Sequence, residues 1–256
     1  MRGVKKKIIY KLQYISMPII ILLIWQIGSF LGIIKEYTIS SPIKVLITTY
    51  QMIKSTVLLE HILWSVFRVV IGFLLAAILG ISFGILTARS KTFAKYTDCI
   101  LQIIKPIPPI AWIPIAILWF GIGEFTKIFI IFLGAFFPIF SNVVDGIKQI
   151  DSKYIEVAEV LEIPKRKMIL KVILLGALPS IMTGLRVGLG SAWMCVVAAE
   201  MIAATRGVGY MLMDGRSLSR PDMVILGMFI IGIIGKVMND FLLKLEKRKI
   251  YWNRKK

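Results

Sequence analysis

Several long stretches of this chain contain no charged residue, and three of them restrict what it can fold into. They cover residues 17–34, 69–88 and 128–144. Each is close to the roughly 20 apolar residues with which an α-helix crosses the hydrocarbon core of a bilayer. The composition agrees, because 57% of the residues are hydrophobic and the mean hydropathy is +0.81, outside the usual range of soluble proteins. We therefore predict an all-α, polytopic membrane protein.

Three further segments are strongly apolar but interrupted. Residues 99–122 contain Lys105 and several prolines, residues 174–204 contain Arg186 and Glu200, and residues 223–243 contain Lys236 and Asp240. With the three uninterrupted stretches, they predict six transmembrane helices. The first stretch follows a basic segment, as a signal peptide would, but it is longer than such peptides usually are and no clean small-x-small cleavage site follows it. We interpret it as a membrane anchor.

The net charge of +18 is explained by where the basic residues lie. They cluster in alternate connections, at residues 2–11, 89–95, 148–171 and 244–256, while the other connections hold few. Basic residues are enriched in cytoplasmic loops, so this pattern places both termini in the cytoplasm. Nucleic-acid binding is disfavoured, because no basic stretch is interleaved with base-stacking aromatic residues on a soluble domain.

The expected organisation has three parts. Residues 1–60 form a cytoplasmic tail, the first transmembrane helix and an outer interfacial helix, since Ile43, Leu46, Ile47, Tyr50 and Ile53 recur at helical spacing. Residues 61–245 form a core of five transmembrane helices with a cytoplasmic loop at 145–175. Residues 246–256 form a basic cytoplasmic tail.

Two spans carry unusual backbone signals. Small residues recur at every fourth position of the second span, at Gly72, Ala76, Gly80, Gly84 and Ala88. This stripe allows close helix approach, either within the chain or at a subunit or gate interface. The third span contains Pro106, Pro108, Pro109 and Pro114, so it must be kinked or broken. Freed backbone at membrane depth must lie inside protein or beside water, which fits either a translocation path or a buried kink.

The long cytoplasmic loop contains a predicted short helix. Asp151 or Ser152 can cap it, and Pro164 ends it or starts the next helix. Tyr154, Ala158 and Leu161 share one face of this helix, and Glu156, Glu159 and Glu162 fall on another. An apolar face outside the membrane must either fold onto the protein or dock into a partner.

The sequence lacks the motifs of an enzyme. It has no P-loop, no G-x-S-x-G turn and no H-E-x-x-H pair, so we expect no catalysis, no bound cofactor and no ATP hydrolysis by this chain itself. Cys99 and Cys195 are far apart and the chain has one histidine, which supports neither a disulfide framework nor a metal site.

Ionisable residues inside the predicted spans are the remaining site signals. Arg186 and Glu200 each cost about 2.5 to 3.5 kcal/mol to insert at mid-depth, and they are too far apart along one helix to pair directly. Either they lie on a translocation path, or Glu200 reaches the outer headgroups and Arg186 pairs with a neighbouring helix. Lys236 and Asp240 form an i,i+4 pair that we interpret as structural.

Several strings, in order, resemble a known family. The loop contains Glu156-Val157-Ala158, followed by Ala177-Leu178-Pro179, and this is similar to the "EAA" signature of permease subunits of binding-protein-dependent ABC importers. The stretches Pro106–Pro114, Trp119–Glu124, Ala198–Ala204 and Gly207–Tyr210 resemble the nitrate, sulfonate and taurine branch of that family. The resemblance extends from about Ser65 to the C-terminus.

The resemblance implies a homodimeric six-helix permease in the lipid bilayer, with two cytoplasmic ATPase subunits that use ATP and one extracytoplasmic solute-binding protein. The short loop helix would then be the coupling helix that docks into the ATPase. Its residues would be Tyr154, Glu156, Val157, Ala158, Leu161, Glu162 and Pro164.

The sequence departs from the family pattern at two positions. Glu162 replaces the glycine of the motif and Leu175 replaces the first of two later prolines. Because glutamate adopts a left-handed backbone poorly, we expect the turn to shift toward Pro164.

The substrate stays open between a small anion and a heterocycle of the thiamine-precursor type. The candidate path residues are Pro108, Pro109, Trp112, Arg186, Trp193 and Glu200, with Arg186 suited to an anion and the two tryptophans to stacking. An ion-coupled carrier that uses Arg186 and Glu200 is the alternative from another class, although the two halves of the chain show no repeat. An intramembrane enzyme is the third class of function considered.

Overall fold

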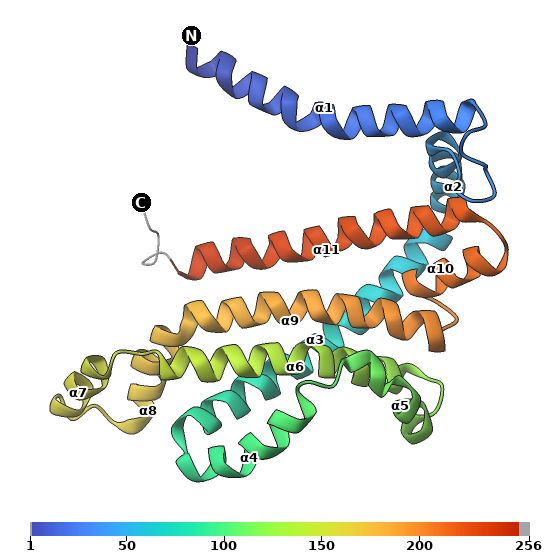
Figure 1. Cartoon of the computed structure of the whole chain (residues 1–256). Helices are drawn as coiled ribbons and strands as arrows, with labels where there is room; N and C mark the ends of the chain where they lie inside the picture. The colour runs from blue at the N-terminus through green and yellow to red at the C-terminus, as the bar shows by residue number, and fades with distance from the viewer. Residues whose placement is uncertain (1, 251–256) are drawn as a thin grey trace. The chain divides into compact units, whose positions relative to one another are not determined.

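The computed structural model describes residues 2–250, with side chains for 16–97, 100–164 and 167–250, and it is helical with no strand in that range (Figure 1). The elements are α1 (Arg2–Phe30), α2 (Pro42–Lys54), α3 (Val57–Arg89), α4 (Lys91–Ile104), a 3-10 turn (Pro109–Trp112), α5 (Ile113–Phe120), α6 (Glu124–Lys148), α7 (Ser152–Val160), α8 (Lys165–Met168), a π-helical segment (Ile169–Ile173), α9 (Leu174–Ala203), α10 (Val208–Ser217) and α11 (Pro221–Lys249).

Four helical segments are long and apolar enough to cross a membrane. They are Val57–Arg89, Glu124–Lys148, Ile169–Ala203 and Pro221–Lys249. The helices Lys91–Ile104 and Pro109–Phe120 pass the same test only as a pair, with a bend of 87° between them. The predicted break in the third span is therefore confirmed, and the proline cluster is its physical cause.

The predicted outer helix is present as α2, in a compact unit that contains α1, α2 and residues Met211–Ile230. The hydroxyl of Ser41 caps α2, and the hydroxyl of Thr48 donates to the carboxylate of Asp222 at 2.6 Å. Arg220 donates to the same carboxylate oxygen at 2.7 Å. These contacts fix α2 to the start of α11. The apolar residues that predicted the helix, from Ile43 to Ile53, are exposed.

In the second unit, which contains Ile62–Tyr210 and the part of α11 from Ile231, α3 runs parallel to α6. Gly72, Gly80 and Gly84 face Ile131, Ile139 and Val143 respectively. The residue numbers of facing partners differ by the same amount in all three pairs, which requires that α3 and α6 run in the same direction. The broken α4–α5 segment must therefore lead the chain from the end of α3 back to the end of the bundle at which α3 began. The small-residue stripe thus packs within the chain, the first of the two interpretations considered for it.

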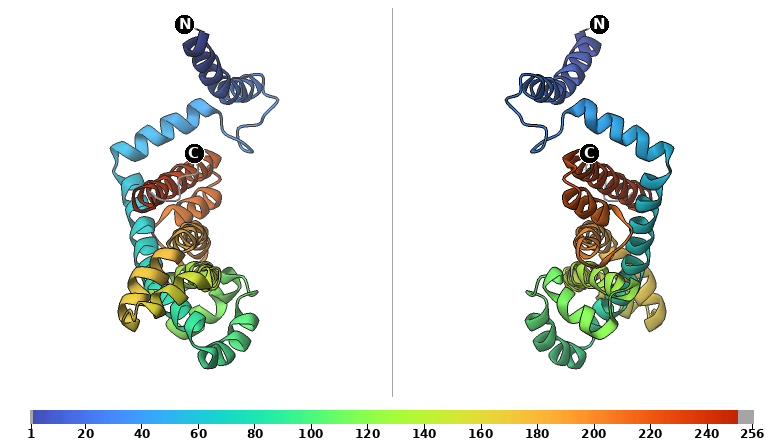
Figure 2. Two further views of the ribbon diagram at one scale, coloured as in Figure 1. Left: turned by 90° about the vertical axis from the view of Figure 1, so that its left-hand side faces the viewer. Right: turned by 90° about the vertical axis from the view of Figure 1, so that its right-hand side faces the viewer.

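Helices α6 and α9 are antiparallel neighbours, and they lie side by side in Figures 1 and 2. Gly134 faces Cys195 near one end of the pair, and Gly146 faces Ser180 near the other. The core between α3, α6 and α9 contains Val69, Ala76, Ile131, Ile139, Ala192 and Val196. As a result, α7 and α8 lie at one end of this bundle, while the start of α6 and the last turn of α9 lie at the other (Figure 1).

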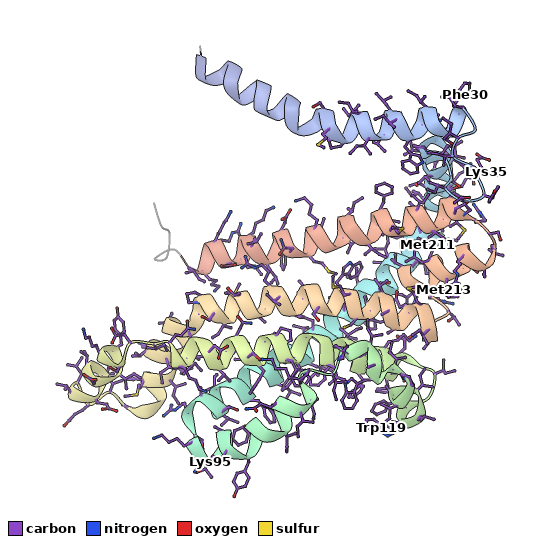
Figure 3. The ribbon with its side chains drawn as sticks, in the orientation of Figure 1. Phe30, Lys35, Lys95, Trp119, Met211 and Met213 are labelled. Atoms are coloured by element: carbon purple, nitrogen blue, oxygen red, sulfur yellow. The ribbon has the colours of Figure 1, made fainter. Side chains whose placement is uncertain are left out.

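Large apolar side chains also cover the outside of the helices. Leu74, Ile78 and Leu86 of α3 are exposed, as is Leu118 of α5. Figure 3 shows side chains projecting from the outer surfaces of the ribbon, with Trp119 at α5. Such a surface suits hydrocarbon rather than water as the surrounding medium.

Candidate functional site

Helix α7 stands apart from the spans and is anchored by one buried residue. The carboxylate of Asp151 caps the helix by accepting from the amide of Lys153 at 3.0 Å, as one of the two predicted caps. Ala158 is only 2% exposed, and it packs with Met168 and Ile173 on the chain that follows. Of the three residues of the predicted apolar face, Ala158 alone is buried against the protein itself.

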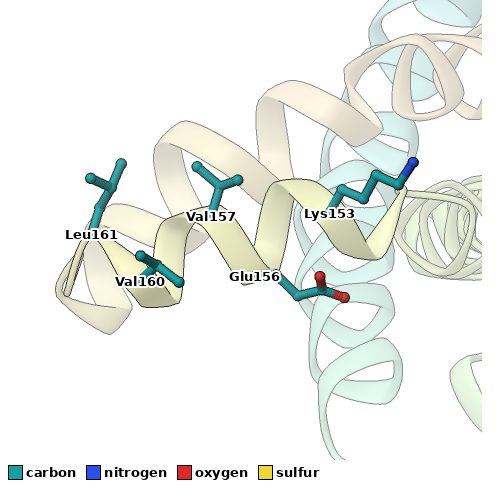
Figure 4. A pocket seen from close by; sticks show the side chains of 5 residues that line it. All are labelled: Lys153, Glu156, Val157, Val160 and Leu161. Carbon is teal, nitrogen blue, oxygen red and sulfur yellow. The ribbon is translucent and has the colours of Figure 1, made fainter.

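The remaining apolar surface of α7 is open. Val157, Val160 and Leu161 are exposed, and Val160 reaches 83%. With Lys153 and Glu156 they line an open hollow of about 480 Å³, shown in Figure 4. Lys153 lies at one end of this surface, Val160 and Leu161 lie at the other, and Glu156 and Val157 lie between them (Figure 4). An exposed apolar strip beside charged residues is suited to docking a protein partner.

Tyr154, Ala158 and Leu161, which were predicted to share a face, line a second hollow. It has a volume of about 740 Å³ and lies between α7 and the start of α9, where Leu175 and Pro179 complete its wall. Tyr154 and Leu161 are exposed there, whereas Ala158 lies at the base. Leu175, which replaces a family proline, continues the helical segment as part of this wall.

The predicted shift of the turn after α7 is wrong. Glu162 itself adopts the left-handed conformation, with φ of 49°, and the turn stays at this residue. The amide of Ile163 donates to the carbonyl of Ala158 at 3.0 Å, and the amide of Glu162 donates to that of Glu159 at 2.9 Å. This pair of bonds is the Schellman motif, and Ile163 adds its hydrophobic contact with the Ala158 cluster. These interactions hold the turn even though no glycine is present.

A buried ion cluster lies at the other end of the bundle and is centred on Arg68 of α3. Its Nε and Nη2 atoms donate to the two carboxylate oxygens of Glu124 at 2.6 and 2.8 Å. Its Nη1 atom donates to Glu200 at 2.7 Å and to the carbonyl of Arg206, also at 2.7 Å. Lys127 completes the cluster with a 2.7 Å bond to Glu124. The guanidinium therefore joins α3, α6 and α9 with little charge left uncompensated.

Glu200 is fully enclosed in this cluster and is 1% exposed. Besides Arg68, it accepts from the hydroxyl of Ser65 at 2.8 Å and from the amide of Gly209 at 3.0 Å. Glu200 lies in the last turn of α9, and its carboxylate is satisfied by partners within the protein. A Cβ atom on Gly207, whose φ is 126°, would overlap the carboxylate, so glycine is required for this close approach.

The prediction from sequence missed Arg68 and Glu124. Arg68 was hidden because it immediately precedes the uncharged stretch, whereas α3 begins at Val57 and so places Arg68 inside the helix. The signal that could have identified it was the helical pattern of residues 57–68. If the helix begins before Arg68, this residue lies within the helix and not at its end. Its partner Glu124 follows a Gly-x-Gly turn in which Gly121 has φ of 74°.

The other candidate path residues lie in two further places. Arg186 and Trp193 line one small pocket between α9 and α11, and the indole N–H of Trp193 donates to the carbonyl of Ile231 at 3.0 Å. Trp112 packs against a separate cluster of Ile113, Ile130 and Cys195. Pro108 and Pro109 lie at the break before α5. The six candidates thus do not form a single site.

A comparison with known families decides the class of the chain. Residues 78–249 match the sequence model of the binding-protein-dependent transport system inner membrane component. The chain belongs to this family. It is therefore a multi-pass component of the cell membrane and a transport protein, not an enzyme, as expected.

Known relatives cover nearly the whole of this permease. A permease protein assigned to aliphatic sulfonate transport in Bacillus subtilis is 41% identical over 92% of this chain and 86% of its own length. The taurine transport system permease protein of Escherichia coli is 34% identical over 91% of this chain and 87% of its own length. The nitrate import permease protein of Synechocystis is 34% identical over 89% of this chain and 85% of its own length. The chain thus lies in the sulfonate, nitrate and taurine branch that its motifs indicated.

Family membership also decides between the competing classes. A permease of a binding-protein-dependent importer works with an ATPase and with a substrate-binding protein. The ion-coupled carrier and the intramembrane enzyme are therefore set aside. Cys195 of this permease is a buried free thiol, while the side chain of Cys99 lies outside the described residues. In the described part of the chain, no group of three or more metal-ligating side chains occurs.

Proposed function

We propose that this chain forms the translocation path of an ATP-driven importer for a small anion, and that it couples to a separate ATPase through α7. ATP is used by that ATPase and not by the permease. The complete importer contains a second copy of this chain, two ATPase subunits and an extracytoplasmic solute-binding protein.

The exposed strip of α7 is the observation that carries the coupling proposal. Val157, Val160 and Leu161 present apolar surface away from the spans, and Ala158 holds the helix against the rest of the chain. A surface helix anchored in this way can transmit a displacement to α9 through Met168 and Ile173. Closure of the ATPase dimer would then rock the permease between inward-open and outward-open states.

The proposed topology has six crossings and both termini in the cytoplasm. The parallel arrangement of α3 and α6 supports one crossing for the broken segment between them. The basic connections at residues 89–95 and 148–171 support a cytoplasmic position for α7. The first crossing is α1, whose described apolar part is Ser16–Phe30. The division at 1–60, 61–245 and 246–256 follows from this topology. Within the last part, residues 251–256 lie outside the described structure.

The relatives favour an anion as the substrate. Their names assign them to aliphatic sulfonates, taurine and nitrate, and another relative is a bicarbonate transport system permease protein. A stacked heterocycle is less well supported, because Trp193 is buried with its N–H already bonded and Trp112 packs in an apolar cluster. The substrate class proposed is therefore a small oxyanion or sulfonate.

The test of coupling uses two exposed positions and one buried position on α7. Val160→Asp and Glu156→Lys change the exposed surface and should abolish co-purification of the ATPase subunit and ATP-dependent uptake, with unchanged membrane levels. Ala158→Asp buries a carboxylate and should abolish uptake by loosening α7 itself. Glu159→Gln is the matched control on the same helix and should retain both activities.

Two results would contradict the coupling proposal. One is normal uptake by both Val160→Asp and Glu156→Lys. The other is loss of ATPase binding in Glu159→Gln to the same degree, which would indicate a general sensitivity of the loop. For the substrate, uptake by proteoliposomes containing the complete importer is compared for nitrate, taurine and a hydroxymethylpyrimidine, and import of the heterocycle alone would exclude the anion.

A further inference from the structure

Arg68 and Arg186 lie inside spans and differ in how completely their charge is satisfied. Arg68 is saturated by two carboxylates and a carbonyl, and it is 2% exposed. Arg186 lies in the middle of the span Ile169–Ala203, yet among the described residues its guanidinium donates no hydrogen bond. Its charge partner is Glu246 of α11, with 3.4 Å between Nη1 and Oε2, beyond the usual hydrogen-bond distance.

Glu246 is incompletely satisfied as well. Its Oε2 atom is buried and has no hydrogen-bond partner in the described structure. A buried carboxylate oxygen without a donor and a guanidinium without an acceptor, held just beyond bonding distance, are both costly in a span. Such a loose pair does not resemble a structural ion pair, whose N–O distances are about 2.7–2.9 Å. The hydrogen bonds of Arg68 are 2.6–2.8 Å long.

Arg186 lines a small pocket. The pocket has a volume of about 50 Å³, and Gly190, Trp193, Gly235 and Asn239 contribute to its lining. Since about 10–15 Å³ of such space is enough to hold one water, the pocket suits a ligand of few heavy atoms. A Cβ atom added to Gly190 would meet nothing within 4 Å, so a larger side chain can be introduced at this wall of the pocket.

The chemistry of the lining favours a small oxyanion. Arg186 offers a planar fork of N–H groups that matches oxyanions, and the side-chain amide of Asn239 can add a donor. The ring of Trp193 serves only as a wall, because its N–H is bonded to Ile231. Among the described residues, no side chain that lines the pocket is acidic, and the carboxylate paired with Arg186 is that of Glu246.

We propose that Arg186 and Asn239 form an anion-binding site within the membrane, and that Glu246 occupies Arg186 when no anion is bound. An arriving anion competes with the Glu246 carboxylate for the N–H groups of Arg186, because both are negative groups that the guanidinium attracts. This inference rests on the proposed function, and it names where on the path the anion is held. It also gives Glu246, near the cytoplasmic end of α11, the role of an internal competitor.

The experiment measures anion binding to the full chain in nanodiscs, without the binding protein. Sodium nitrate is titrated against sodium gluconate at constant ionic strength, and the half-saturating nitrate concentration is taken from the rise in unfolding temperature. Arg186→Gln should raise this concentration at least about tenfold, because a charge-assisted bond is lost. Glu246→Gln should lower it at least about fivefold, since the competing charge is gone. Gly190→Leu should abolish saturation by filling the pocket.

The controls separate the site from general effects. Lys236→Gln removes a positive charge from the exposed pair on α11 and should leave the half-saturating concentration unchanged. Arg186→Lys keeps the charge without the fork and should give an intermediate value, provided that its unfolding temperature without nitrate matches wild type. An Arg186→Gln protein that titrates like wild type would overturn the proposal. So would an equal loss in Lys236→Gln, or a wild-type protein that shows no saturation with nitrate, bicarbonate or methanesulfonate.

Parallel uptake measurements distinguish this inference from the proposed function. If the complete importer transports an anion but binding does not depend on Arg186, the intramembrane site is wrong and the permease function stands. If the chain binds nitrate through Arg186 but no ATP-dependent uptake occurs with any tested anion, the proposed import function is wrong and the binding site stands.

Discussion

The Nη1 atom of Arg68 lies 2.7 Å from the Oε1 atom of Glu200, and both side chains are buried. This contact joins α3 to α9 at the end of the bundle opposite α7. Because the same guanidinium holds Glu124 of α6 by two bonds, three spans meet at a single charged group. Trp64 packs against the cluster, with the guanidiniums of Arg68 and Arg206 at 5.4 and 5.9 Å from its ring.

Arg68→Met should strongly destabilise the permease. The substitution leaves Glu200 buried without its cation, and removal of one partner from a buried ion pair costs about 3–5 kcal/mol. The measurement is the free energy of unfolding of the purified chain in detergent. Lys236→Met, which breaks the exposed pair with Asp240, is the control and should change it by less than about 0.5 kcal/mol. Equal effects of the two substitutions would contradict a structural role for the cluster.

Gly207→Ala should displace Glu200 from the cluster. The added methyl group would overlap the Glu200 carboxylate, and φ of 126° is unfavourable for any residue with a side chain. We expect a loss of more than about 2 kcal/mol in the free energy of unfolding. Gly123→Ala is the matched control, since Gly123 is extended and a Cβ there meets nothing within 4 Å. If both variants unfold like wild type, the close approach at Gly207 is wrong.

Features that depend on local sequence were predictable. Two uninterrupted apolar stretches identified the spans Val57–Arg89 and Glu124–Lys148, prolines identified the break before α5, and the spacing of apolar residues identified α2. Each of these signals lies within one segment of the sequence, so the element could be predicted without knowing which other helix it packs against. Helix α10 was missed, because Val208–Ser217 carries Gly209 and Gly215 and has no long apolar run.

Features that depend on distant partners were not predictable. Arg68 meets Glu124 and Glu200 across 56 and 132 residues of sequence, and nothing near any of the three identifies the other two. Glu200 was recognised as unusual from its position in a span, but its burial depends on Ser65 and on the Gly209 amide. The turn at Glu162 was mispredicted because residue preference was weighed without the hydrogen bonds that hold the turn.

Glu162→Gly should stabilise the turn after α7 without moving it. A left-handed conformation costs a residue with a side chain about 1–2 kcal/mol, and glycine avoids most of this cost. Hydrogen exchange of the α7 amides should therefore slow, with uptake activity retained. Glu159→Gly, in the last turn of the helix, should speed exchange because glycine weakens helices by about 1 kcal/mol. Faster exchange in Glu162→Gly would mean that the glutamate side chain itself holds the turn.

The same substitution at two helical glycines should have opposite effects on stability. A Cβ atom on Gly84 would lie 2.7 Å from a methyl carbon of Val143, so Gly84→Ala must push α3 away from α6 and should lower the free energy of unfolding by about 1–3 kcal/mol. A Cβ atom on Gly232 of α11 meets nothing within 4 Å, and Gly232→Ala should raise the free energy by up to about 1 kcal/mol through helix propensity. Unfolding of both purified variants in the same detergent provides the comparison. Because helix propensity alone would stabilise both proteins, a gain in stability for Gly84→Ala would show that α3 and α6 do not pack through the small-residue stripe.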